Sequence, residues 1–317
     1  MTAKIVSVMG ATGVQGASVI DTLLKDSQYT IRAITRNTSS KAAQALAARG
    51  IEVVQADAND VSSLTSAFAG SQAIYAITNF FEPFGQHGPE KAMEAEEQQG
   101  INIAQAAAAT PSLTHYIWST LPDANHISGG KYLVPHFESK NRVDRYIHSQ
   151  PALLAKTTFL WVGFYAQNMY VPLLRPVELP TAPGTWVQLS STPADVPIPS
   201  IGDAPANIGL FIRAILEQPR KTLPGKFVLA HVEVLTAGEI LQAWGRAQGK
   251  MVQYLQVGDE AYNSLWPLWG EEMGLNMKYF EFAKEKSFST EGELLTKDDL
   301  GIEGLIGAEE AFAKMEF

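Results

Sequence analysis

Three evenly spaced glycines between a short apolar strand and a helix place the strongest limit on how this chain can fold. Residues 5–9 form an apolar run, which predicts a buried parallel strand. Gly10, Gly13 and Gly16 follow it, and the apolar positions in residues 17–24 then recur at helical spacing. This order is typical of a site that binds the phosphates of a dinucleotide. Ordinary turns also favour glycine, but the position between strand and helix favours the binding site.

The first half of the chain continues to alternate between strand and helix patterns. Strands are predicted at residues 30–35, 51–55, 73–77, 115–118 and 157–161. Helices are predicted at residues 40–49, 61–68, 90–109 and 135–148. Repeated β-α units predict an α/β fold with a parallel sheet covered by helices. After about residue 165 the sequence becomes rich in proline, which predicts loops and short strands laid over the sheet.

Composition excludes several classes of function. Of the 317 residues, 46% are hydrophobic and 18% are charged, which is typical of a globular protein. The net charge of −9, without a long basic run, argues against nucleic acid as a partner. The chain has no cysteine, which excludes disulfides and thiol chemistry, and we expect no metal site. Without a secretory pattern or an apolar stretch of about 20 residues, we expect no membrane partner and a soluble, cytoplasmic protein.

Arg36 follows the second predicted strand, where an NAD-binding site normally carries an acidic residue that accepts from the ribose hydroxyls. An arginine instead matches a 2′-phosphate, because its planar fork donates to two phosphate oxygens. A solvated surface arginine is the alternative, but no carboxylate occurs in residues 30–50 to take the acidic role. The sequence therefore predicts NADP(H) as the cofactor, with Lys41 as a further donor.

Polar residues also end the third, fourth and fifth strands, at the sheet edge where ligands of open parallel sheets bind. Asp57 fits two roles equally well, an acceptor for an adenine amino group or a turn residue. Thr78 and Asn79 can bond the ribose or phosphate of the cofactor, although turn chemistry explains them almost as well. The Ser119 hydroxyl could orient a substrate carbonyl, and capping is the alternative.

His136 and Lys140 are four residues apart in a predicted helix and therefore lie on one face of it. Short-chain reductases carry Tyr-x-x-x-Lys, and here histidine stands in place of the tyrosine. A lysine at this position could bind the nicotinamide ribose or stabilise a developing oxyanion. A surface lysine and a partly buried histidine are the alternative, but the position after the fifth strand favours a site role for Lys140.

Together these features resemble the NmrA-like branch of the atypical short-chain dehydrogenases. The segments that carry the resemblance are residues 10–16, 35–37, 78–82, 99–100, 136–140, 164–168, 195–199 and 202–203. The resemblance implies a Rossmann-type doubly wound parallel sheet, a smaller C-terminal α+β domain, a cleft between them, and a preference for NADP. We expect residues 1–165 to form the NADP-binding domain, residues 193–220 to pack back onto it, and residues 166–317 to form a substrate or partner domain.

The family pattern also implies which residues contact the cofactor. Those implied at the pyrophosphate are Gly10, Thr12, Gly13, Val14, Gln15 and Gly16. Arg36 and Lys41 would hold the 2′-phosphate. Those implied along the nicotinamide half are Thr78, Asn79, Lys140 and Tyr165.

The resemblance implies two functions, since members of the family differ in activity. The first, which the sequence favours, is an NADPH-dependent reductase of a small apolar carbonyl, enone, quinone or imine. Lys140 would position the ribose and stabilise negative charge, with His136, Ser119 or water as the proton donor. The second is a non-catalytic NADP(H)-sensing regulator that binds a protein partner.

Overall fold

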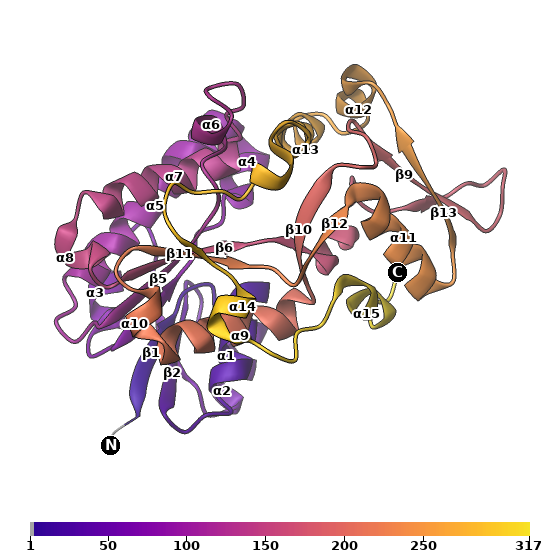
Figure 1. Ribbon diagram of the computed structural model, residues 1–317. Coiled ribbons are helices and arrows are strands. Elements are labelled where there is room, and N and C mark those ends of the chain that lie inside the picture. Colours follow the sequence, from indigo (N-terminus) through magenta and orange to yellow (C-terminus); the bar gives the residue numbers. More distant parts are fainter. Residues whose placement is uncertain (1–2) are drawn as a thin grey trace.

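The computed structural model describes residues 3–317, and its central element is an eight-stranded sheet (Figure 1). Its strands are β1 (Lys4–Val8), β2 (Tyr29–Thr35), β3 (Glu52–Gln55), β4 (Ala73–Ala76), β5 (His115–Thr120), β6 (Thr157–Val162), β11 (Lys226–Ala230) and β14 (Leu294–Leu295). They lie in the order β14-β11-β6-β5-β4-β1-β2-β3, and every neighbouring pair is parallel. The strand order reverses between β1 and β4, which is where ligands bind in doubly wound sheets. The predicted Rossmann-type fold is therefore confirmed.

Helices cover both faces of this sheet, as the buried side of each helix requires. Side chains of α1 (Val14–Leu23), α2 (Lys41–Ala48) and α9 (Ala204–Glu217) pack in the core on one face. Those of α3 (Val61–Phe68), α5 (Pro89–Ala108) and α7 (Pro135–His148) pack in the core on the other face. Helix α9 approaches α1 so closely that the Gly209 backbone N–H donates to Ser18 Oγ at 2.9 Å, and a Cβ on Gly209 would overlap α1.

A smaller α+β part with two further sheets lies beyond one end of the main sheet (Figure 1). One small sheet contains β7 (Phe164–Tyr165), β10 (Pro197–Gly202) and β12 (Glu233–Thr236), and the other contains β8 (Val177–Glu178), β9 (Thr185–Ser190) and β13 (Met251–Gln256). Its two longer helices are α11 (Ala237–Gln248) and α13 (Trp269–Ala283), and the six-residue helix α15 (Ala308–Ala313) lies near the end of the chain. The short helices of the chain are α4 (Phe81–His87), α6 (Ala124–Ile127), α8 (Pro151–Leu154), α10 (Pro219–Thr222), α12 (Asp259–Leu265), α14 (Lys297–Leu300), η1 (Ala166–Tyr170) and η2 (Lys284–Lys286).

The chain passes more than once between the main sheet and the smaller part. It leaves the sheet after β6, returns for α9 and β11, leaves again, and returns for β14 (Figure 1). The division into domains at residue 165 stays a prediction, and the main sheet continues past it through two later strands. Within residues 3–317, none of the helices combines the length and the apolar character needed to cross a bilayer.

Candidate functional site

The glycine-rich turn between β1 and α1 has backbone geometry that side chains would obstruct. Gly10 has φ of +62°, in the left-handed region that favours glycine. The Gly13 N–H donates to the Gly10 carbonyl at 2.9 Å, which closes the turn. A Cβ on Gly16 would overlap the Gly10 backbone, so helix and turn can pack this closely only with glycine. Helix α1 begins at Val14 behind Gly13, which has no side chain with which to cap the helix, and the first-turn N–H groups can therefore meet phosphate oxygens.

A cavity of about 1040 Å³ opens above this turn and extends along the carboxyl ends of the strands. The lining of the cavity contains nearly all of the residues singled out by the sequence. These are Gly10, Thr12, Gly13, Val14, Gln15, Gly16, Arg36, Asp57, Thr78, Asn79, Ser119, His136, Lys140 and Tyr165. The opposite side is formed by α13 of the smaller part, through Trp269, Met273, Asn276 and Phe280.

Lys41 lies apart from these residues. It is exposed as the first residue of α2 and does not line the cavity. Asp57 does line the cavity, but its side chain accepts from the backbone N–H and the side-chain amide of Asn59 at 2.8 and 2.9 Å, so turn chemistry accounts for it. The Asn79 side chain likewise accepts from the Phe81 backbone N–H at 3.2 Å.

Arg36 lies at one end of this cavity and is paired with Glu82 of α4. Its Nη1 and Nη2 donate to the two carboxylate oxygens of Glu82 at 2.7 and 2.9 Å. The pair is open to solvent, with side-chain exposures of 63% for Arg36 and 45% for Glu82. Sequence reasoning did not identify Glu82, because nothing in its spacing indicates that α4 folds back to the end of β2.

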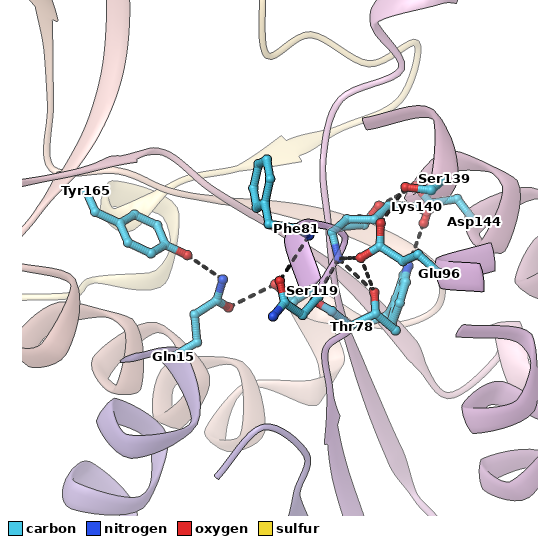
Figure 2. Close-up of polar contacts among 12 residues, drawn as sticks. Gln15, Thr78, Phe81, Glu96, Ser119, Ser139, Lys140, Asp144 and Tyr165 are labelled. Atoms are coloured by element: carbon cyan, nitrogen blue, oxygen red, sulfur yellow. Dashed lines mark hydrogen bonds and ion pairs between the residues drawn. The ribbon is translucent and has the colours of Figure 1, made fainter. Parts of the chain in front are cut away.

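Lys140 lies in a buried polar cluster with Glu96, Thr78 and Ser139 (Figure 2). Its ammonium is 2.9 Å from Glu96 Oε1 and donates to Thr78 Oγ1 at 2.9 Å. Glu96 is fully buried on α5 and also accepts from Thr78 Oγ1 at 2.6 Å and from the Ser139 hydroxyl. The buried Glu96 carboxylate and the Thr78 hydroxyl therefore hold the Lys140 ammonium in one position.

Sequence reasoning missed Glu96, although the sequence contains a signal. Ala92, Gly100 and Ile103 lie four residues before, four residues after and seven residues after Glu96, and all three are buried. Glu96 therefore interrupts the apolar stripe of an amphipathic helix. A carboxylate in such a position is almost never buried without a partner, and that partner is Lys140 of the neighbouring helix α7.

Asp144 fixes α7, and with it Lys140, against β5. Its carboxylate accepts from Trp118 Nε1 at 2.7 Å and from Thr120 Oγ1 at 2.9 Å, as Figure 2 shows in part. Burial of the carboxyl group raises the pKa of Asp144 from 3.8 to about 7. The hydrogen bonds from Thr120 and Trp118 lower this pKa, but burial has the larger effect.

This shifted pKa predicts a stability change with pH. Between pH 3.8 and about 7 the folded state binds a proton at Asp144 that the unfolded state does not. The contribution of Asp144 to stability is therefore full below pH 3.8 and is lost as the pH rises through 7. We expect Asp144→Asn to remove this slope and to cost about 1–3 kcal/mol through the altered hydrogen bonds. Urea unfolding of both proteins at several pH values gives the free energy of unfolding as a function of pH. The same pH dependence in wild type and variant would contradict the raised pKa of Asp144.

Gln15 links the glycine-rich turn to the middle of the cavity (Figure 2). Its side-chain amide donates to the Tyr165 hydroxyl, and its oxygen accepts from Ser119 Oγ at 2.9 Å and from the Tyr75 hydroxyl. Burial raises the pKa of Tyr165 well above its usual range, so this phenol is neutral. The structure thus brings together Gln15, Ser119 and Tyr165, which the sequence placed in three separate motifs.

His136 is oriented by a residue of the smaller part. Its Nδ1 lies 2.5 Å from Glu272 Oε1, and its backbone N–H donates to the same oxygen at 3.2 Å. Glu272 lies on α13 and is 4% exposed. A carboxylate acceptor at Nδ1 requires the proton on that nitrogen, which leaves Nε2 as the nitrogen that could meet a ligand in the cavity. Sequence reasoning missed Glu272, whose partner is 136 residues away.

Two related proteins align with different fractions of the chain. An NmrA-like family domain-containing oxidoreductase of Aspergillus campestris is 29% identical over 263 residues, which cover 80% of this chain and 75% of that protein. A second one, from Aspergillus hancockii, is 32% identical over 177 residues, which cover 56% of this chain and 51% of that protein. The second match thus spans about half the length of that relative.

Solved structures share the fold over nearly the whole chain. NmrA, a negative transcriptional regulator solved in complex with NADP, superposes with a TM-score of 0.75 at 23% identity, covering 99% of this chain and 95% of that one. Citrobacter sp. triphenylmethane reductase complexed with NADP(H) superposes with a TM-score of 0.68 at 21% identity, covering 97% and 98%. At these identities the likeness shows the fold alone.

A family model that matches almost the full length of the chain shows which family the protein belongs to. The model of the NmrA-like family matches residues 2–311, a range that includes the glycine-rich turn, Arg36, the Glu96–Lys140 pair and Glu272. The resemblance stated from separate motifs is thereby confirmed, and the chain belongs to the NmrA-like family.

Proposed function

We propose that this protein is an NADPH-dependent oxidoreductase that reduces a small apolar carbonyl, enone, quinone or imine. The observation that carries the proposal is one cavity with three parts: a glycine-rich turn, an arginine fork at one end, and a buried ammonium group in front of an aromatic wall. Residues 1–165 would contribute most of the cofactor contacts, and residues 166–317 would contribute the wall that faces the substrate.

The chain's own residues fit a dinucleotide. The first turn of α1 offers backbone N–H groups to a pyrophosphate behind a glycine turn that would not accommodate a side chain. Arg36 offers two parallel N–H donors to a 2′-phosphate. Thr78, Asn79 and Tyr165 line the part of the cavity assigned to the nicotinamide half. When bound, NADPH supplies a hydride, and the reduced substrate must gain a proton as well.

Lys140 would act as a fixed positive charge. Glu96 and Thr78 fix its ammonium, each at 2.9 Å, so the lysine serves as a positioned hydrogen-bond donor and electrostatic stabiliser. Such a donor stabilises the oxygen or nitrogen atom of the substrate as negative charge develops on it. Since Glu96, Thr78 and Ser139 fix the side chain beforehand, little reorganisation is needed during the reaction.

His136 is the preferred proton donor among the three candidates, with Ser119 and water as the others. Glu272 fixes the ring through Nδ1, in the way that a carboxylate orients a catalytic histidine, and leaves Nε2 available to the cavity. Ser119 Oγ donates to Gln15 at 2.9 Å in this structure and would have to leave that bond to serve a substrate.

The wall of the cavity around His136 favours an apolar substrate. The rings of Phe81 and Trp269 stack with centroids 5.8 Å apart, and the Phe81 and His136 rings lie 5.2 Å apart. Met273 and Phe280 continue this wall. Aromatic walls with a few fixed polar groups are typical of pockets for small organic ligands, and the relatives named oxidoreductases and the triphenylmethane reductase support this class of reaction.

A second function, a cofactor-sensing regulator, is supported by the fold shared with NmrA, which is described as a negative transcriptional regulator and was solved with NADP. A change in cofactor would be transmitted through α4 and α13, which meet at the Phe81–Trp269 contact. The partner would then be a protein that binds the smaller part of the molecule.

One experiment separates the two functions. The absorbance of NADPH is followed with the purified protein and a panel of quinones, ketones, enones and imines. Consumption that depends on both protein and substrate supports the oxidoreductase. If the protein binds NADPH but consumes none with any member of the panel, the oxidoreductase proposal is contradicted, and NADP-dependent capture of a defined protein partner would support the regulator.

A further inference from the structure

Arg36 and Glu82 form an ion pair at the proposed cofactor site. Both residues line the cavity and lie 46 positions apart: Arg36 directly follows β2, and Glu82 lies in α4. Their contact is bidentate, with both terminal guanidinium nitrogens of Arg36 donating to the two Glu82 oxygens at 2.7 and 2.9 Å. This geometry uses the face of the guanidinium group that matches a carboxylate or a phosphate.

A 2′-phosphate held by Arg36 would need the same two N–H donors. We propose that Glu82 is a specificity-determining residue that competes with the 2′-phosphate of NADP(H) for Arg36. The inference rests on the proposed cofactor site. NADP(H) binds by replacing the carboxylate at the fork, whereas NAD(H), which has a hydroxyl there, leaves the ion pair in place. Glu82 therefore makes the ratio of the affinities for NADP(H) and NAD(H) smaller than it would be with Arg36 alone.

The exposure of the pair makes such an exchange energetically accessible. The two side chains are 63% and 45% exposed, and exposed ion pairs contribute little net stability. A phosphate with a charge near −2 interacts with arginine more strongly than a single carboxylate does. The Glu82 carboxylate would also repel a phosphate bound beside it. Removing its charge therefore strengthens phosphate binding in two ways, by freeing the Arg36 donors and by ending this repulsion.

Glu82 is also joined to the aromatic wall that faces the substrate. It follows Phe81 in α4, and Phe81 stacks on Trp269 of α13. Phe84, one turn further along, meets the same Trp269 ring edge-on at 5.0 Å. Exchange at the arginine fork thus takes place at the start of the helix whose side chains form part of that wall.

The test measures cofactor binding and does not require turnover. Calorimetric titrations with NADPH and NADH are compared for the wild type and Glu82→Gln, which keeps the shape of the side chain and removes its charge. We expect the Kd for NADPH to fall roughly fivefold and the Kd for NADH to change less than about twofold. Glu90→Gln is the matched control, because Glu90 is exposed, follows α4 closely and does not line the cavity.

A second variant pair distinguishes competition for the fork from general repulsion. In an Arg36→Ala background, Glu82→Gln should bring little or no gain for NADPH, because there is no fork to release. An equal gain in both backgrounds, or no gain in the wild-type background, overturns the inference. If the wild type binds NADPH and Glu82→Gln binds it no more tightly, this inference alone fails. If neither protein binds either cofactor, the proposed function fails together with it.

Discussion

Replacing Lys140 by methionine is expected to lower NADPH-dependent turnover by a factor of about a thousand while the cofactor still binds. Removing one preorganised donor to a developing negative charge costs roughly 10²–10³ in rate, and the Lys140 donor is fixed in place by an ion pair with the buried Glu96. Methionine keeps the unbranched apolar stem of the side chain, without the terminal ammonium, and can pack over Trp118, whose ring centroid lies 5.4 Å from the Lys140 ammonium. The loss should therefore fall mainly on kcat.

The variant must be shown to be folded, because Glu96 loses its ion-pair partner. Thr78 and Ser139 remain as hydrogen-bond donors to Glu96, and the carboxyl group can also take up a proton. Thermal unfolding and NADPH titration provide these two checks. Lys91→Met on the same helix as Glu96 is the control, because Lys91 is exposed and does not line the cavity. Turnover within tenfold of wild type in a folded, NADPH-binding Lys140→Met protein would remove Lys140 from the proposed chemistry.

Replacing Arg36 by alanine is expected to weaken NADPH binding far more than NADH binding. A charge-assisted bond to phosphate contributes about 2–3 kcal/mol, which corresponds to a factor of roughly 30 to 150 in Kd. NADH lacks the phosphate, so its Kd should change by only a few fold. Parallel titrations of wild type and variant with the two cofactors measure the ratio.

Arg49→Ala is a suitable control for this experiment. Arg49 forms an exposed ion pair with Asp21 at 2.5 Å and does not line the cavity, so its loss removes an equal charge without removing a ligand donor. Equal weakening of NADPH and NADH binding by Arg36→Ala would mean that the arginine acts on the shared part of the two molecules, and the assignment to the 2′-phosphate would be wrong.

The architecture was predictable from the sequence because each βα unit of the main sheet carries its own signals. Apolar strands and amphipathic helices alternate through β5, and each predicted strand and helix in this part lies within a few residues of its predicted bounds, whereas α4 was not predicted as a helix. The strand β14 was not predictable, since it consists of only Leu294–Leu295 and pairs with β11, whose residues lie far earlier in the chain. Such short pairings depend on tertiary packing and leave almost no periodic pattern.

The candidate site was predictable only on the side formed by strand ends. Arg36 and Ser119 were identified because the carboxyl ends of parallel strands meet at one edge of the sheet, Gly10 from the glycine spacing, and Lys140 from its helical spacing to His136. The three carboxylates that pair with the site residues were not found. Those residues are Glu82, Glu96 and Glu272. Each lies on a helix whose rotation and approach are set by packing, and only Glu96 interrupts a clear apolar stripe.

The position of β6 in the sheet affects how the chain folds while it is being synthesised. Its outer neighbour in the sheet is β11, which begins 69 residues after Thr157, at Lys226. While the ribosome is still adding the intervening residues, the emerging part of the main sheet has β6 as an edge strand whose outer N–H and C=O groups lack their partners on β11. Truncation after residue 165 would leave that strand permanently exposed, so such a fragment should aggregate unless a chaperone protects it.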